Sequence, residues 1–297
     1  MTKRSRRLFA HVAGLMLGGV AILAAAMVSA QPRQTPPTIA IIIDDMGNAG
    51  SWGERLIHLN YPLTLSFLPF RPFTHEQAIE AHGLGKEIML HMPMANTRKL
   101  PLGAAGLTPN MDEVTFTRTL LHALQSIPYV QGVNNHMGSL LTQEVRPMDW
   151  VMEEISRYPL YFVDSRTIAT SVAANVANQY QIPNLSRDVF LDDVQTEQAI
   201  DVQFKRLLDI ARKDGTAVAI GHPHPATVEY LEQHLPQLDA EGIAVATVSG
   251  LWHIRNDNHV MFASRKEAIL PNMALGQIDM SNTLHSGTAR SSRARLN

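Results

Sequence analysis

Cysteine is absent from the 297-residue chain. This absence excludes disulfides, thiolate nucleophiles and cysteine-ligated metals. Any bound metal must therefore be held by His, Asp or Glu. Hydrophobic residues make up 45% of the chain, which is enough for a large buried core and is typical of a globular domain.

A basic surface is also lacking once the amino-terminal leader is set aside. Residues 1–30 carry four basic residues and no acidic one, so the formal charge changes from −2 for the whole chain to −6 without them. The remaining chain is acidic overall, and this balance disfavours a nucleic-acid partner.

Residues 1–30 have the pattern of a signal peptide or signal anchor. A basic patch precedes an apolar stretch at 8–28, and "VSA" before Gln31 fits a small-x-small cleavage site. "SRRLF" partly matches a twin-arginine signal, although the ordinary secretory route is favoured. If the leader stays uncleaved, its length approaches a bilayer span and would form the one membrane anchor. We therefore expect an exported protein of the periplasm or cell envelope.

The rest of the chain divides into three parts. Residues 31–36 form a polar, proline-rich linker, and residues 37–256 form the folded domain. Residues 257–297 form a carboxy-terminal extension, which is expected to be largely disordered because its later part lacks apolar periodicity.

Short apolar runs alternate with amphipathic stretches throughout the folded domain. The runs predict strands at 38–43, 63–68, 87–91, 130–134, 160–163, 189–191, 216–220 and 243–248. Runs such as "IAIII" are apolar on consecutive residues, as strands buried on both faces of a parallel sheet require. The pattern favours an α/β fold, a distorted (β/α) barrel of seven to eight parallel strands. An open doubly wound sheet is the alternative, but the first turn, "DDMGNAG", lacks a G-x-G-x-x-G phosphate loop.

Polar residues follow five of the predicted strands. They are Asp44 and Asp45, His91, the group Asn134, Asn135 and His136, the group Asp164, Ser165 and Arg166, and the pair His222 and His224. One such residue is commonly a helix cap or a structural histidine, but the carboxyl ends of parallel strands share one rim, where sites of this fold class lie. Five other histidines fall in helical or loop stretches with no partner pattern and are interpreted as surface or structural residues: His58, His75, His82, His122 and His234.

Two imidazoles and one carboxylate make a three-ligand site for Zn²⁺ or another divalent first-row ion, with a position left for water. Such an ion lowers the pKa of its water to about 7, and a second carboxylate nearby can act as base. Because the backbone turns at a strand end, one of two adjacent aspartates can reach the metal while its neighbour reaches the water.

Seven motifs, in order, resemble the divergent polysaccharide deacetylase family, a branch of the NodB-type carbohydrate esterases. They are "IAIIIDD", "LSFLPF", "EIMLHMPM", "NNHMGSLLT", "YFVDSRT", "RDVFLDD" and "IGHPHP", and they extend from about residue 37 to residue 252. The resemblance implies a distorted barrel and metal-dependent removal of N-acetyl groups from a polysaccharide or peptidoglycan-like glycan.

The resemblance also implies roles. Asp44 corresponds to the catalytic base, and Asp45 and His91 correspond to metal ligands. The family has a further histidine four residues after His91, where this chain has Ala95, and His136 is the nearest substitute as third ligand. His222 resembles the catalytic acid, with His224 as its local competitor.

Three further residues at the same strand ends are expected to contact substrate or support the ligands: Asn135, Asp164 and Arg166. Two other hypotheses remain. The domain could be a catalytically degenerate envelope module that binds glycan or protein, or it could catalyse another metal-dependent hydrolysis on the same rim.

Overall fold

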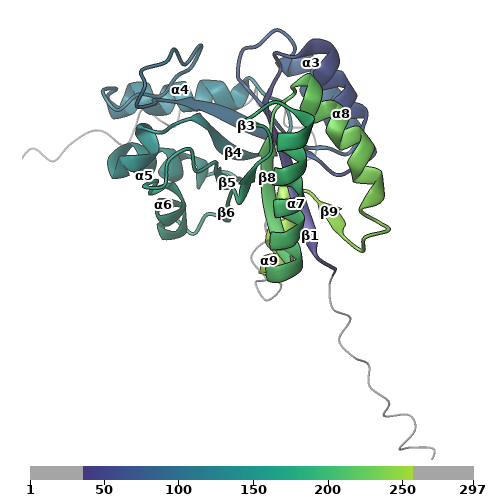
Figure 1. Ribbon diagram of the computed structural model, residues 1–297. Coiled ribbons are helices and arrows are strands. Elements are labelled where there is room, and N and C mark those ends of the chain that lie inside the picture. Colours follow the sequence, from purple (N-terminus) through teal and green to yellow (C-terminus); the bar gives the residue numbers. More distant parts are fainter. Residues whose placement is uncertain (1–35, 257–297) are drawn as a thin grey trace, which may run out of the picture. The chain divides into compact units, whose positions relative to one another are not determined.

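The computed structural model describes residues 36–256 (Figure 1). The predicted leader at 1–30, nearly all of the linker at 31–36 and the extension at 257–297 lie outside the described residues. Within the described part, no helix has both the length and the apolar character needed to cross a membrane.

A single parallel sheet forms the centre of the domain. Its strands follow the order β6-β5-β4-β3-β2-β1-β8-β7, and β9 pairs with β1 beside this path. All ladders between the named strands are parallel. This arrangement confirms the predicted distorted barrel. The bounds are β1 Thr38–Met46, β2 Thr64–Phe67, β3 Glu87–Met94, β4 Val130–Met137, β5 Tyr161–Asp164, β6 Asn184–Ser186, β7 Val189–Phe190, β8 Thr216–Gly221 and β9 Ala244–Ala246.

All helices of the described residues but the last connect strands and cover the outside of the sheet, and the last, α9, packs inside the barrel (Figure 1). They are α2 Gly50–His58, α3 Thr74–Gly83, α4 Glu113–Gln125, α5 Val145–Ile155, α6 Ala173–Gln179, α7 Glu197–Asp214, α8 Pro225–His234 and α9 Val248–Arg255, with short 3-10 turns at Leu141–Gln143 and Leu235–Gln237. Their ends follow local sequence signals. The Thr196 hydroxyl accepts a hydrogen bond from the Ala199 N–H at the start of α7, and Gly215 ends that helix with φ of 85°.

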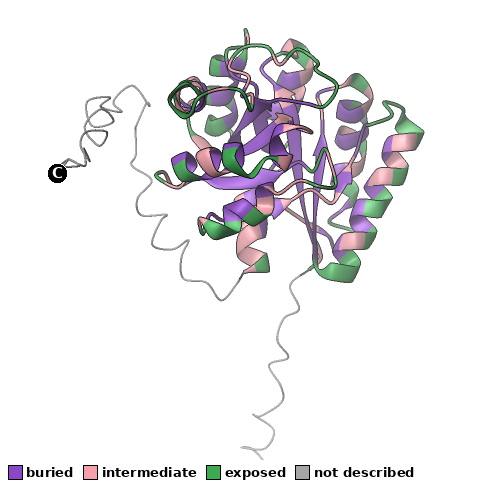
Figure 2. Ribbon diagram, turned by 90° about the vertical axis from the view of Figure 1, so that its left-hand side faces the viewer, coloured by how far each residue is buried: buried purple, intermediate pink, exposed green. Residues whose placement is uncertain are grey.

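The two faces of the sheet belong to two different cores. On β1, Ile39, Ile41 and Ile43 pack in the large cluster beneath the helices, whereas Ala40 and Ile42 belong to a smaller cluster inside the barrel. Figure 2 shows the strands as almost wholly buried, while each helix exposes one side. Consecutive apolar residues on β1 are therefore explained by burial on both faces.

Helix α9 occupies the inside of the barrel near the amino-terminal ends of the strands. Val248 and Leu251 of α9 belong to the inner cluster. The buried Glu87 carboxylate accepts a hydrogen bond from Thr64 Oγ1 at 2.8 Å and from the Ser249 N–H at 3.3 Å. Thr64 Oγ1 in turn accepts a hydrogen bond from the Val248 N–H at 3.0 Å, so Glu87 and Thr64 satisfy two N–H groups at the start of α9 that have no partner within the helix. Helix α9 thus fills the inside of the barrel at the amino-terminal ends of the strands, and the polar side chains of the inner face lie at the opposite, carboxyl ends.

Candidate functional site

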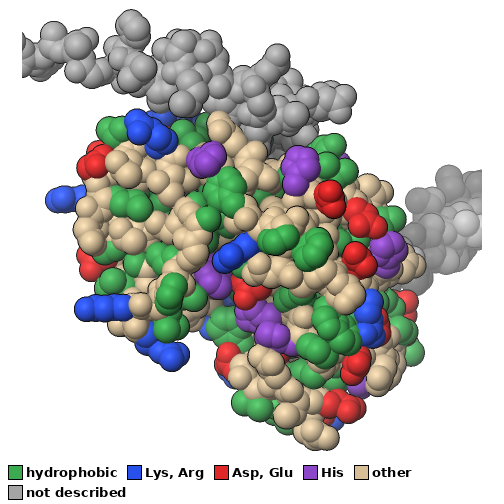
Figure 3. Space-filling view, turned by 90° about the horizontal axis from the view of Figure 1, so that it is seen from above, with side chains coloured by type: hydrophobic (Ala, Val, Ile, Leu, Met, Phe, Trp, Pro, Cys, Tyr) green, Lys and Arg blue, Asp and Glu red, His purple; other side chains and the backbone are tan. Residues whose placement is uncertain are grey.

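Strand alternation places a row of polar side chains on the inner face. On β1, Asp44 continues the inner series of Ala40 and Ile42. On β3 and β4, His91 pairs with Asn134 in the ladder, so their side chains are neighbours on the same face, and His136 follows two residues later. Figure 3 looks onto this end of the domain and shows histidine side chains in and beside a hollow near the middle of the face.

Asp45 reaches the same pocket because the backbone leaves the extended conformation. Its φ is 57°, in the left-handed region that non-glycine residues adopt infrequently. The ladder between β1 and β2 shifts register between Ile43 and Met46 at this point. Met137 and Arg166, at the ends of β4 and β5, also have left-handed φ values of 55° and 47°. Uncommon backbone conformations therefore gather at this rim, as they often do at functional sites.

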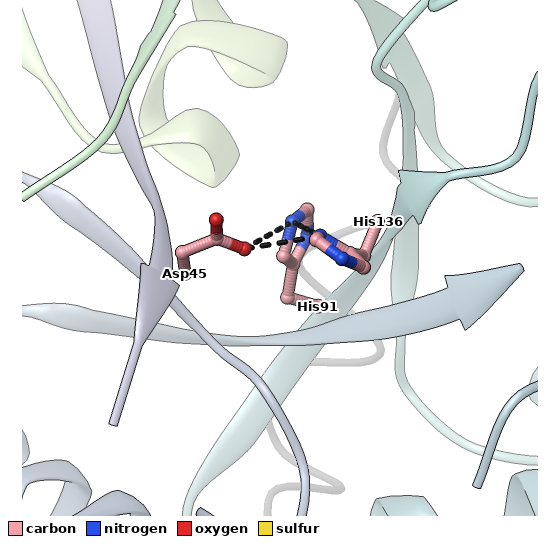
Figure 4. A group of neighbouring side chains, drawn as sticks. All are labelled: Asp45, His91 and His136. Carbon is pink, nitrogen blue, oxygen red and sulfur yellow. Dashed lines mark hydrogen bonds and ion pairs between the residues drawn. The ribbon is translucent and has the colours of Figure 1, made fainter. Parts of the chain in front are cut away.

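Three potential ligand atoms point toward one another (Figure 4). Asp45 Oδ1 lies 3.0 Å from His136 Nδ1 and 3.4 Å from His91 Nε2, and the two histidine nitrogens are 3.1 Å apart. Although buried, Asp45 Oδ1 has no hydrogen bond of acceptable geometry within residues 36–256. The structure thus brings together the three residues that the sequence suggests as metal ligands.

This donor set fits a divalent first-row ion. Imidazole nitrogen and carboxylate oxygen suit zinc, and four-coordinate bonds of about 2.0 to 2.1 Å place neighbouring ligand atoms roughly 3.3 Å apart. The measured separations of 3.0 to 3.4 Å are close to that spacing. A buried carboxylate oxygen without a hydrogen bond is the kind of atom that a cation would satisfy.

The electrostatics of the pocket favour positive charge. Burial by itself opposes ionisation of Asp45, but its contacts with His136 and His91 outweigh burial and hold the pKa of Asp45 well below its usual value. Burial alone would lower the pKa of His91, yet the charges of Asp44 and Asp45 raise it. Asp44 is itself so deeply buried that its pKa is raised, against the opposing effect of His91. A cation among these groups would stabilise both carboxylates in their ionised form.

His222 forms a pair with Asp192, a residue without a role in the sequence-based prediction. Asp192 Oδ1 lies 2.9 Å from His222 Nδ1, and Asp192 Oδ2 accepts hydrogen bonds from the His222 N–H and Thr227 Oγ1, both at 2.7 Å. Burial disfavours the charged imidazole, but the hydrogen bond and charge of Asp192 raise the pKa of His222 to about 9. The signal was present in "RDVFLDD", where two carboxylates follow a short apolar strand as they do after β1.

Asp192, His222 and His224 make a second group with ligand atoms close together. Both Asp192 oxygens are occupied by the hydrogen bonds to His222 and Thr227, in contrast to Asp45 Oδ1. His224 Nε2 faces Gln195 Nε2 at 3.0 Å, outside the pair. The second group is therefore better described as an oriented imidazole than as an open cation site.

Asn135 and Asp164 hold the rim loops. Asn135 Oδ1 accepts from the Ser165 N–H at 3.0 Å, and Asp164 Oδ1 accepts from the Arg166 N–H at 2.8 Å. Arg166 is exposed at the rim, where its backbone carbonyl accepts a hydrogen bond from Arg187. These contacts connect the ends of β4 and β5, and contact of Asn135, Asp164 or Arg166 with substrate stays a prediction.

The histidines interpreted as surface or structural residues lie outside both groups. His82 stacks on Tyr129 with ring centroids 3.9 Å apart, His234 stacks on Tyr230 at 3.8 Å, and His122 contacts Phe70 at 4.6 Å.

The fold and the site together describe an α/β protein with a parallel barrel and a candidate metal centre of acidic and imidazole groups at its carboxyl rim. Comparison with known proteins identifies its family. Residues 41–252 match the model of the divergent polysaccharide deacetylase family, and the chain belongs to that family.

The chain is also similar to two curated proteins and to a solved structure. The chain is 41% identical over 195 residues to the uncharacterized protein YibQ of Escherichia coli (strain K12), covering 66% of this chain and 61% of that protein. The chain thus spans about three fifths of that relative. An uncharacterized protein of Haemophilus influenzae is 32% identical over 214 residues, which cover 72% of this chain and 76% of that protein. The crystal structure of an uncharacterized protein from Agrobacterium tumefaciens C58 superposes with a TM-score of 0.70 at 22% identity, over 75% of this chain and 92% of the other, which shows a shared fold.

Proposed function

We propose that the protein is a metal-dependent hydrolase of the cell envelope that deacetylates an N-acetylated polysaccharide or peptidoglycan-like glycan. The observation that carries the proposal is the convergence of Asp45 Oδ1, His91 Nε2 and His136 Nδ1 within 3.0 to 3.4 Å, with the buried Asp44 adjacent in the chain. Membership of the divergent polysaccharide deacetylase family supports the substrate class.

Asp45, His91 and His136 would hold the ion, and zinc suits this donor set. When bound, a zinc ion supplies Lewis-acid chemistry that acidifies water and polarises an acyl oxygen. His136 would take the place of the histidine that the family motif has at the position of Ala95. Ala95 offers no side-chain ligand, and its backbone carbonyl accepts hydrogen bonds from the N–H groups of Leu140 and Leu141.

The reaction needs two proton transfers, one to Asp44 as the base and one from His222 as the acid. Asp44 accepts a proton from the attacking water as the C–O bond to the acetamide carbonyl carbon forms. His222, held as an imidazolium by Asp192, donates a proton to the departing sugar nitrogen as the C–N bond breaks. One amide and one water thus give acetate and a free amino sugar. A pKa of about 9 keeps His222 protonated at neutral pH, which is the state that an acid needs.

The location in the envelope rests on the leader pattern at residues 1–30 and is part of this proposal. An exported enzyme meets envelope glycan directly. Fractionation of cells that express the full chain, followed by mass measurement of its amino terminus, tests both export and cleavage after Ala30.

The test of activity combines metal analysis with acetate release. We expect the purified full-length protein to bind one zinc ion and to release acetate from N-acetylated chito-oligosaccharides or peptidoglycan, and a chelator should abolish the release. His91→Ala should lose both zinc and activity, whereas His75→Ala, an exposed imidazole of α3, should keep both. Zinc binding without acetate release from any of these glycans contradicts the deacetylase assignment.

A catalytically degenerate binding module remains the alternative, because the family's second histidine is replaced at Ala95. In that case the protein should bind glycan with equal affinity with and without zinc, and Asp44→Asn should leave binding unchanged. Release of phosphate in place of acetate would instead indicate a different hydrolytic reaction on the same rim.

A further inference from the structure

Asn134 lies at the centre of the site and contacts both halves of it. The residue has no exposed surface. Its Nδ2 lies 2.7 Å from Asp44 Oδ1, and its Oδ1 lies 2.7 Å from both His91 Nδ1 and Ser66 Oγ. One amide therefore links the candidate base to a candidate metal ligand and anchors both to β2.

The neighbours of Asn134 fix the orientation of its amide. Asn134 Nδ2 donates to Asp44 Oδ1, and Ser66 Oγ donates to Asn134 Oδ1, so the amide turns its NH₂ group toward Asp44. The amide oxygen then faces Ser66 and His91, and it can only accept. His91 Nδ1 must consequently carry a hydrogen. The lone pair that remains for a cation is on Nε2, the atom that faces Asp45 and His136.

We propose that Asn134 is a positioning residue that fixes His91 for metal binding through Nε2 and holds Asp44 beside the same ion. The inference rests on the proposed function for the role of Asp44, but its metal-binding half does not require catalysis. A ligand imidazole whose other nitrogen donates to a fixed acceptor keeps its ring orientation, and loss of such an acceptor typically lowers metal affinity about 10- to 100-fold. A residue that only packed the core would affect folding and leave the affinity of the folded protein unchanged.

Two substitutions separate the halves of this role. Asn134→Asp keeps an acceptor for His91 but removes the donor to Asp44 and sets a second carboxylate against it. We expect zinc affinity within about threefold of wild type and kcat lowered at least ~10-fold. Asn134→Leu removes both hydrogen bonds at similar volume, and the zinc Kd should rise about 10- to 100-fold. Ser66→Ala is the matched control, because it removes a donor to the same amide oxygen without touching His91 or Asp44, and both quantities should change less than about threefold.

Zinc affinity is measured by competition with a chromophoric chelator, on variants shown to be folded by circular dichroism. A second measurement on the wild-type protein keeps the proposal falsifiable even if Asn134→Leu does not fold. In zinc-loaded protein with ¹⁵N-labelled histidine, His91 should coordinate through Nε2 and retain a slowly exchanging Nδ1–H. Coordination through Nδ1, or an unchanged zinc affinity in a folded Asn134→Leu, overturns the proposal. Zinc binding as expected without acetate release refutes the proposed function but leaves the metal-positioning role of Asn134 supported.

Discussion

Replacing Asp192 by Asn should move the titration of His222 by at least two pH units. Asp192 Oδ2 accepts from the His222 N–H and from Thr227 Oγ1, so an amide at this position must place its oxygen there and its NH₂ group against His222 Nδ1. That nitrogen then has to accept, which favours the neutral imidazole. The pKa of His222 should fall from about 9 to its ordinary value of 6.5 or below.

The free energy by which the site favours the protonated form of His222 follows from the rise of its pKa from 6.5 to about 9. A change of 2.5 pKa units corresponds to about 3 kcal/mol of differential interaction, and this is an upper value because the side chain is 26% exposed. The sign also predicts a pH-dependent stability. Because the folded-state pKa lies above the unfolded value, the stabilisation is complete below pH 6.5 and is lost as the pH rises through about 9. Urea unfolding of the wild type should show this loss, and Asp192→Asn should not.

The assay is an NMR titration of the His222 ring protons in metal-free protein, followed by the pH profile of kcat/KM in zinc-loaded protein. A bound cation offsets the charges of Asp44 and Asp45, so the alkaline limb of the kcat/KM profile should lie at a lower pH than the metal-free titration, both in the wild type and in Asp192→Asn. The limb of Asp192→Asn should still lie at least one pH unit below that of the wild type. His224→Ala serves as control and should keep the wild-type limb. A wild-type His222 that titrates near 6.5, or a limb that does not move in Asp192→Asn, refutes the assignment of His222 as an acid tuned by Asp192.

Three further outcomes are expected. Asp44→Asn should retain zinc but lower kcat at least ~10²-fold, the usual size of a general-base effect, and normal turnover would exclude Asp44 as the base. His136→Ala should raise the zinc Kd at least ~10-fold, whereas His224→Ala should not, as measured by chelator competition, and equal losses would remove His136 from the ligand set. Gly215→Ala should destabilise the fold by about 1 kcal/mol, because Gly215 has φ of 85°, while Gly83→Ala, within α3, should be neutral or stabilising by thermal melting.

The strand pattern predicted most of the fold, because runs buried on both faces give a strong signal. Each of the eight predicted strands corresponds to an observed strand. The missed strand, β6, has the sequence "NLS" and carries a single apolar residue, Leu185, so it lacks the pattern that identifies the others. Three strands run well past their predicted ends, β1 to Met46, β3 to Met94 and β4 to Met137, because polar site residues interrupt the apolar run before the hydrogen-bonded ladder ends.

The candidate metal group was also predictable, since Asp45, His91 and His136 all follow or end strands that share one rim. The residues that hydrogen-bond to the site histidines, Asn134 and Asp192, were not predictable in the same way. The role of Asn134 depends on the register that sets it opposite His91, and the pairing of Asp192 with His222 depends on β7 lying beside β8. Neither ladder can be deduced from apolar runs alone, because the runs give the existence of strands but not their neighbours.

The adjacent carboxylates Asp44 and Asp45 illustrate how the backbone decides the chemistry. In an extended strand neighbouring side chains point to opposite faces, and Asp45 would then lie among the helices with Ile41 and Ile43. The left-handed φ of 57° at Asp45 turns its side chain to the inner face that Asp44 already occupies. Such a conformation is unfavourable for most residues, but aspartate tolerates it better than residues with apolar side chains. An aspartate at this position therefore serves two needs at once, the turn of the chain and the carboxylate oxygen that faces both histidines.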